Sequence, residues 1–159
     1  MAVAIRKEDN SVTPSTTVRV VLPGGGYDIQ IGSGLLATAS TFLLQCRRTK
    51  HVVVITDSNV EPLYAETVGE QFSEQELDVN ILTIEPGEPS KSPEMALELW
   101  QIMLDVATDR QSVILSIGGG VVGDLAGFVA STFARGLGFL QMPTTLLAQV
   151  DSSVGGKTG

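Results

Sequence analysis

Cysteine, histidine and aromatic residues are all scarce in this chain. Its 159 residues include one cysteine and one histidine, and aromatic residues make up 5%. A single cysteine, Cys46, excludes a disulfide within the sequence, and we expect it to pack in the core. The single histidine, His51, has no second histidine or paired cysteine with which to bind a metal, so we expect it at the surface or at a strand end.

Positive charge is also scarce. The formal net charge is −8, from 10 Lys and Arg residues against 18 Asp and Glu residues. This balance argues against binding to nucleic acid or to an anionic membrane by bulk electrostatics, so any phosphate group must be bound by local groups. A hydrophobic fraction of 43% and 17 glycines are typical of a compact α/β protein about one domain long.

The N-terminus lacks the apolar segment of a secretion signal, and we interpret residues 1–17 as a polar tail. Residues 112–134 contain one charge, Asp124, and are long enough to cross a bilayer. A charge near the centre of a span costs ~3 kcal/mol, and the glycine cluster disfavours a spanning helix, so we expect no membrane span. The lone cysteine fits a reducing compartment, and we expect a cytoplasmic protein.

What the sequence does contain is a regular alternation of strand-like and helix-like segments. Residues 18–22 and 27–31 flank a Pro-Gly-Gly-Gly turn and predict a β-hairpin at the edge of a sheet. The periodicity predicts buried strands at 52–56, 79–84, 113–117 and 139–142, and helices at 35–48, 60–72, 93–106, after Asp124 and from Thr144-Thr145. We therefore predict an α/β fold over residues 18–159, with a Rossmann-like, mostly parallel sheet flanked by helices.

The strand at 113–117 ends at a cluster of glycines. Gly118, Gly120 and Gly123 have the spacing G-x-G-x-x-G between a strand and a helix. Because glycine has no Cβ, backbone N–H groups and a helix N-terminus at such a turn can approach a pyrophosphate. The same glycines could instead only close a tight turn, so the motif alone leaves both interpretations open.

Polar residues follow the other predicted strands at the same point. Asp57 ends one strand, Lys91 follows another, and Thr144 and Thr145 follow a third. Ligands bind at the carboxyl edge of a parallel sheet, where an acidic residue can accept the ribose hydroxyls of a dinucleotide. Asp57 could equally cap a helix, and Lys91 could be a solvated loop charge. The usual acid about 20 residues after the glycines is missing from residues 139–145, so a cofactor would cross this edge in a less common way.

Together these stretches resemble the 3-dehydroquinate synthase family, the cyclising enzymes of aromatic biosynthesis. The matching segments, in the expected order, are residues 56–59, 87–92, 118–128, 143–145 and 151–159. The resemblance implies an N-terminal domain that binds NAD. In the family, a helical C-terminal domain supplies a Glu and two His ligands for a divalent metal, zinc or cobalt. That domain is absent from this chain, so the resemblance implies no metal ligands here and no turnover by the chain alone.

The resemblance also assigns cofactor contacts to individual residues. It implies that Asp57 and Asn59 lie at the adenosine ribose and that Glu88 and Lys91 lie by the nucleotide. The residues implied to cradle the pyrophosphate are Gly118, Gly119, Gly120, Val121, Val122, Gly123 and Asp124.

A further group of residues is implied to lie near the reacting end of the cofactor. Thr144 and Thr145 would reach the cofactor. Asp151, Lys157 and Arg135 match positions near the nicotinamide and the substrate and are the catalytic candidates, with Asp151 and Lys157 also contacting the cofactor. Full-length relatives are expected to be homodimers, in which Arg135 serves the neighbouring subunit's site.

The implied reaction converts 3-deoxy-D-arabino-heptulosonate 7-phosphate, a phosphorylated keto acid, to 3-dehydroquinate in the shikimate pathway. NAD⁺ oxidises one hydroxyl, which acidifies the neighbouring C–H and lets phosphate leave. The cofactor then reduces the ketone, and ring opening with aldol closure gives the product. Two alternatives stay open: a sister sugar-phosphate cyclase, and a non-catalytic nucleotide-binding module.

Overall fold

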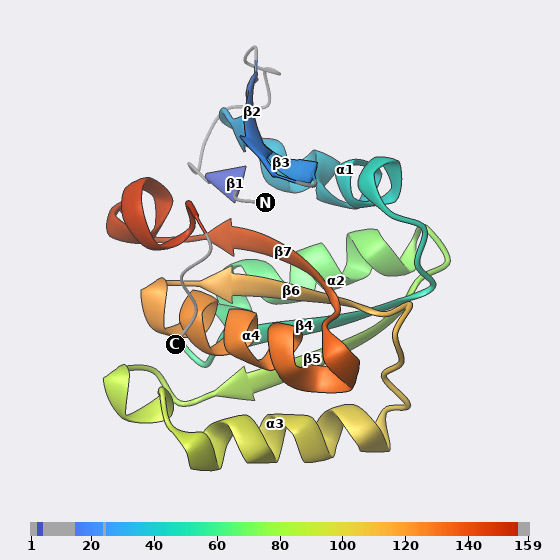
Figure 1. The fold of residues 1–159 in the computed structure, drawn as a ribbon, viewed down its shortest axis with the longest axis vertical. Coiled ribbons are helices and arrows are strands. Elements are labelled where there is room, and N and C mark those ends of the chain that lie inside the picture. Colours follow the sequence, from blue (N-terminus) through green and yellow to red (C-terminus); the bar gives the residue numbers. More distant parts are fainter. Residues whose placement is uncertain (1–2, 5–14, 24, 156–159) are drawn as a thin grey trace.

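The main sheet has four parallel strands in the order β5-β4-β6-β7 (Figure 1). The structure is a computed structural model that describes residues 3–4, 15–23 and 25–155. The four strands are β4 (His51–Asp57), β5 (Asp78–Ile84), β6 (Val113–Gly118) and β7 (Gly138–Pro143). The predicted parallel sheet is therefore confirmed, with strand bounds within one or two residues of those expected.

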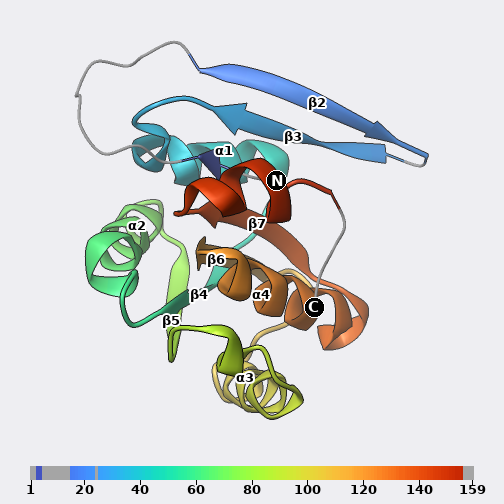
Figure 2. The ribbon, with the colours of Figure 1, turned by 90° about the vertical axis from the view of Figure 1, so that its left-hand side faces the viewer.

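Helices cover both faces of this sheet and produce three layers (Figure 2). One face packs against α1 (Ala39–Cys46) and α2 (Glu66–Ser73), and the other against α3 (Pro93–Asp105) and α4 (Gly120–Thr132). The shorter helical turns are η1 (Leu35–Thr38), η2 (Glu61–Ala65), η3 (Glu88–Ser90), η4 (Phe133–Arg135) and η5 (Ala148–Ser152).

Burial on both faces explains why β4 is almost uniformly apolar. Val52 and Val54 pack toward α1 and α2, whereas Val53 and Ile55 pack toward α3 and α4. All four side chains are fully buried. Each such side chain contributes roughly 1.5–3 kcal/mol of hydrophobic stabilisation, so this strand is a large part of the core.

The connections that follow β4 and β6 leave the sheet on opposite faces. The chain leaves β4 toward α2 and returns in β5. It then runs through α3 on the opposite face and enters β6, which lies on the other side of β4. It leaves β6 toward α4 on the opposite face from α2. Two neighbouring parallel strands whose connections diverge in this way create a crevice at their carboxyl ends, which is the usual ligand position in open α/β sheets.

The register places all four carboxyl ends at one edge. Thr56 pairs with Ile117, and Gly118 pairs with Pro143. The residues that follow β4, β5, β6 and β7 therefore lie at the same level, as the sequence predicted for the polar groups there.

The hairpin forms as predicted but lies outside the main sheet. β2 (Thr16–Leu22) and β3 (Gly25–Ile31) pair antiparallel, and β1 (Val3–Ala4) pairs with β3 to make a separate three-stranded sheet. The prediction that the hairpin is an edge of the main sheet is wrong, because β3 takes its backbone partners from β1 and β2. Parts of the predicted 1–17 tail, at 3–4 and 16–17, belong to these strands.

Two helix bounds also differ from the prediction. The helix expected at 35–48 ends at Cys46, because Arg47 is extended and its guanidinium donates to the carbonyl of Arg110 at 2.9 Å. α4 begins at Gly120, inside the glycine motif rather than after Asp124. No helix among residues 3–4, 15–23 and 25–155 is both long and apolar enough to cross a membrane.

The single cysteine and histidine lie toward the amino edge of the sheet. Cys46 is exposed, so its predicted place in the core is wrong. His51 begins β4, where its Nδ1 lies 3.0 Å from Ser112 Oγ and its Nε2 lies 2.8 Å from Asn80 Oδ1. The predicted strand-end position of His51 is confirmed, and its ring ties the beginnings of three strands together.

Replacement of Gly118 should disturb the packing of α4 against β6. A Cβ there would lie 2.6 Å from Val122 Cβ, closer than folded proteins allow. We expect Gly118→Ala to destabilise the protein by about 1–3 kcal/mol in chemical denaturation, because α4 must move away from β6. Gly123→Ala is the control, since its Cβ would make an ordinary 3.6 Å contact with Gln141 Oε1. Equal unfolding free energies for the two variants would contradict this packing.

Candidate functional site

The turn between β6 and α4 leaves backbone donors unsatisfied. Gly119 is the N-cap residue of α4, and no side chain caps the helix. The first helical hydrogen bond runs from Gly123 N to Gly119 O at 3.0 Å. The N–H groups of Gly120, Val121 and Val122 therefore have no partner among the described residues. Together with a partial charge of about +0.5 at the helix N-terminus, these donors suit an anion.

The connection after β7 folds back over this turn. Thr144 N donates to Gly118 O at 2.9 Å. Thr145 Oγ1 accepts from Ala148 N at 3.2 Å and so caps the helical segment that ends in η5. A Cβ on Gly119 would lie 3.4 Å from Thr145 Cγ2. The glycine turn and the threonine pair therefore form one cluster, as predicted.

The η5 turn completes the cluster on the same side. A Cβ on Gly120 would lie 3.3 Å from Ser152 Oγ, so this hydroxyl faces the start of α4. Asp151 precedes it and is exposed. The sequence predicts Asp151 as a site residue but not Ser152. Only the position of Ser152 next to Gly120 shows that it belongs to the cluster.

Asp57 lies beside the glycine turn because β4 and β6 are tied at their ends. Thr56 Oγ1 donates to Ile117 O at 2.8 Å. The Asp57 carboxylate is half-buried, and its Oδ1 accepts from the N–H groups of Asn59 at 3.0 Å and Val60 at 3.1 Å. These bonds stabilise the turn that leads into η2, whose own N-cap residue is Val60 and has no side-chain cap. Oδ2 has no hydrogen-bond donor among the described residues, so the carboxylate can still accept a ligand hydroxyl. The Asn59 side chain is exposed next to it.

Lys91 forms an ion pair that the sequence did not reveal. Its Nζ lies 2.8 Å from Asp124 Oδ2 in α4 and 4.0 Å from Glu88 Oε1. The hydrogen bond to Asp124 raises the pKa of Lys91 above its ordinary value. Lys91 is therefore not a solvated loop charge. No sequence signal joins two residues 33 positions apart, so only the fold could show this contact.

Two predicted catalytic residues are not brought into this cluster by the described structure. Arg135 follows α4, whose 13 residues extend away from the glycine turn by about 20 Å. Arg135 is exposed and lies toward the amino edge of the sheet. Lys157 lies outside the described residues.

The described residues do not form a metal site by themselves. Residues 3–4, 15–23 and 25–155 contain no group of three or more His, Cys, Asp or Glu side chains placed to bind a metal ion.

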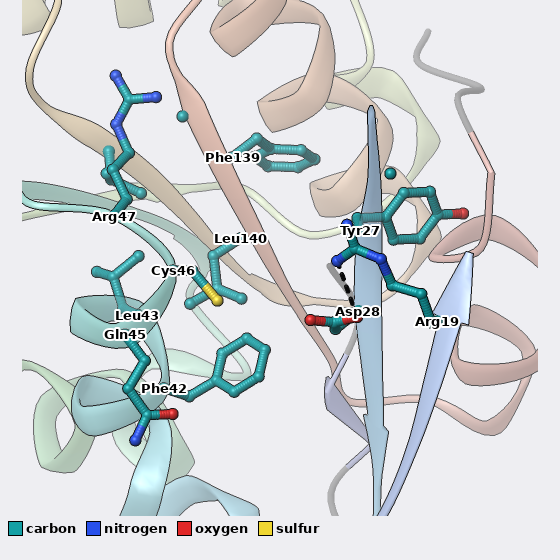
Figure 3. Close-up of a pocket in the computed structure, with 13 residues that line it drawn as sticks. Arg19, Tyr27, Asp28, Phe42, Leu43, Gln45, Cys46, Arg47, Phe139 and Leu140 are labelled. Atoms are coloured by element: carbon teal, nitrogen blue, oxygen red, sulfur yellow. Dashed lines mark hydrogen bonds and ion pairs between the residues drawn. The ribbon is translucent and has the colours of Figure 1, made fainter. Parts of the chain in front are cut away.

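A separate hollow lies at the other end of the sheet (Figure 3). It has a volume of about 560 Å³ and lies between β3, α1 and the amino ends of β6 and β7. Arg19 pairs with Asp28 at 3.0 Å in its wall. Although Cys46 as a residue is exposed, partial desolvation of its thiol by the hollow raises the pKa of that thiol. Both guanidinium groups that line the hollow are already engaged, since Arg19 pairs with Asp28 and Arg47 donates to the carbonyl of Arg110 at 2.9 Å. The glycine turn is therefore the better anion site.

Comparison with protein families and curated proteins gives a consistent result. A family model described as 3-dehydroquinate synthase N-terminal matches residues 81–159. The 3-dehydroquinate synthase of Desulforamulus reducens is 50% identical over 141 residues, which cover 89% of this chain and 39% of that protein. The chain thus spans about two fifths of the length of the curated relatives that it matches.

Two solved structures of similar fold were determined with NAD⁺ bound. One is 2-deoxy-scyllo-inosose synthase complexed with carbaglucose-6-phosphate, NAD⁺ and Co²⁺, with a TM-score of 0.79 and 26% identity over 86% of this chain and 37% of that chain. Another is 2-epi-5-epi-valiolone synthase from Streptomyces hygroscopicus subsp. jinggangensis 5008 with NAD⁺ and Zn²⁺ bound. Its TM-score is 0.73, at 26% identity over 88% of this chain and 38% of that chain.

Proposed function

We propose that this chain, which belongs to the 3-dehydroquinate synthase family, is the NAD-binding part of a 3-dehydroquinate synthase. The observation that carries the proposal is the uncapped N-terminus of α4 at the crevice between β4 and β6. Its free N–H groups suit a pyrophosphate, and the Asp57 carboxylate on the neighbouring strand suits a ribose. NAD⁺ in two solved structures of similar fold supports the same cofactor here.

The role of the chain is to bind and orient the cofactor. When bound, NAD⁺ supplies a reversible hydride acceptor for a substrate hydroxyl. The first turn of α4 would hold the pyrophosphate, and Asp57 would fix the ribose. Thr144, Thr145 and Ser152 would form the wall beside the glycine turn. Because the net charge is −8, these local donors rather than the overall field must attract the dinucleotide.

For the whole protein we propose conversion of 3-deoxy-D-arabino-heptulosonate 7-phosphate to 3-dehydroquinate and phosphate in the cytoplasm. Identity of 50% to a 3-dehydroquinate synthase, against 26% to the two other cyclases, favours this substrate over those of the sister enzymes. The divalent metal would be bound by residues outside those described here. In a homodimer, Arg135 would reach a neighbouring subunit's site, which agrees with its distance from the glycine turn.

The glycine turn can be tested directly. We expect Gly120→Val to weaken NAD⁺ binding by roughly tenfold or more, because its methyl groups would crowd the first-turn N–H groups and Ser152. Calorimetric titration measures binding, and a thermal melt of the same variant measures stability. Thr67→Val is the control, because it places a valine at an exposed position of α2, on the other face of the sheet, and it should bind like wild type. Unchanged binding with a collapsed melt would mean that the glycines only close a turn.

Asp57 should determine the choice between the two dinucleotides. Its carboxylate would repel the 2′-phosphate of NADP⁺, so we expect the chain to prefer NAD⁺. Asp57→Asn keeps the shape but loses a charge-assisted hydrogen bond of ~1.5–3 kcal/mol, and should weaken NAD⁺ binding about ten- to a hundredfold. In the same variant the affinity for NADP⁺ should fall less, or should rise. Competitive titration compares the two, and an equal small loss for both would leave Asp57 as a helix cap alone.

A further inference from the structure

An exposed apolar stripe runs along α3, the helix at the bottom of Figure 1. Leu97 is 53% exposed, Leu104 is 66% exposed, and half-buried Trp100 lies between them. Because residues three and four apart lie on one side of a helix, these three side chains form a stripe two turns, or about 10 Å, long. The stripe is distinct from the buried side of α3, where Leu99 and Met103 pack toward the sheet.

A hollow between α3 and α4 lies beside this stripe. Its volume is about 360 Å³, and its apolar lining includes Trp100, Leu125 and Phe128. The rings of Trp100 and Phe128 have their centroids 6.0 Å apart, and Phe128 is itself partly exposed. The stripe and the hollow together form one apolar groove, which we call the α3–α4 groove. Contiguous exposed apolar surface that contains aromatic anchors is typical of a site where another molecule docks.

Negative charge borders the α3–α4 groove. Glu94, Glu98 and Asp105 are exposed on α3, at a spacing that places them in a row beside the two leucines. Residues 57–108, which include α2, β5 and α3, contain 12 of the chain's 18 Asp and Glu residues but one of its 10 Lys and Arg residues. That one, Lys91, already forms an ion pair with a carboxylate of α4 at 2.8 Å. The α3 side of the molecule therefore has a strong excess of negative charge.

This charge distinguishes between the possible occupants of the groove. A second copy of the chain that packed its own groove here would bring two strongly acidic surfaces together, and its net charge is also −8. A basic partner instead gains from the acidic row as well as from the apolar surface. Anchor positions two turns apart beside a neighbouring helix suit an amphipathic helix, whose apolar residues recur at i, i+3 and i+7.

We propose that the α3–α4 groove is a docking site for a basic amphipathic helix of another protein. The apolar side chains of that helix would enter the hollow and contact Leu97 and Leu104, and its Lys or Arg side chains would lie against the acidic row of α3. This site is separate from the proposed NAD site, because Leu125 and Phe128 lie beyond the first turn of α4, where the free N–H groups are.

The probe for this site is a synthetic helix of about 18 residues, with leucines at i, i+3 and i+7 on one face and lysines on the other. Trp100 is the single tryptophan of the chain, so its fluorescence reports occupation of the groove, and calorimetry measures the affinity. One control peptide replaces the lysines by glutamates, and the other shuffles the same residues so that no apolar face forms. We expect the probe to bind at least about tenfold more tightly than either control.

Two pairs of variants locate the contact on the protein. Leu97→Gln should weaken binding of the lysine peptide about tenfold, because it removes an apolar anchor. Its control is Leu63→Gln in η2, which changes an equally exposed leucine on the opposite face and should have little effect. Glu98→Lys should weaken binding about threefold or more, whereas the same charge reversal at exposed Glu70 on α2 should have a smaller effect.

Several results would overturn the proposal. They are equal effects of the two leucine variants, equal affinity for the lysine and glutamate peptides, and no binding of the lysine peptide by the wild-type chain. Displacement of the peptide by NAD⁺ would overturn it in favour of a cofactor subsite. Dimers in sedimentation experiments that Leu97→Gln dissociates would overturn it in favour of a second copy of the chain.

Discussion

The divergence of the chain after β4 and β6 is the constraint on which the site depends. The two strands lie side by side and parallel, yet α2 and α4 pack on opposite faces. Their ends are therefore held together, by the hydrogen bond from Thr56 to Ile117 O, while the loops that follow separate. This geometry keeps the N-terminus of α4 open and places Asp57 beside it. The threonine pair after β7 and η5 then close one side of the same crevice.

The glycines of this turn have different physical roles. Gly118 allows β6 and α4 to pack closely, because a side chain there would collide with Val122. Gly119 and Gly120 instead face Thr145 and Ser152, at distances that a small side chain could nearly tolerate. Gly118, where the fold excludes any added side chain, thus differs in role from Gly119 and Gly120, which leave the N-terminus of α4 accessible. A spacing motif in a sequence cannot separate these two roles.

Much of the fold followed from patterns in the sequence. Short β-branched runs such as 52–55 locate the strands, and their predicted parallel order is enough to place Asp57, Lys91 and Thr144 at one edge of the sheet. Features that depend on contacts between distant residues could not be predicted in this way. Examples are the separate sheet of the hairpin, the early end of α1 and the Lys91–Asp124 pair. Local periodicity does not show which sheet a hairpin joins, or which lysine or arginine forms an ion pair with a given carboxylate.

A dinucleotide that binds at the start of α4 must contact the backbone N–H groups there. The most direct test follows the backbone amide resonances of a ¹⁵N-labelled sample during titration with NAD⁺. We expect the largest shift changes at Gly120, Val121 and Val122, and we expect them to saturate together. Changes concentrated at Cys46 and Arg47 in the opposite hollow, with the start of α4 unaffected, would contradict binding at the glycine turn.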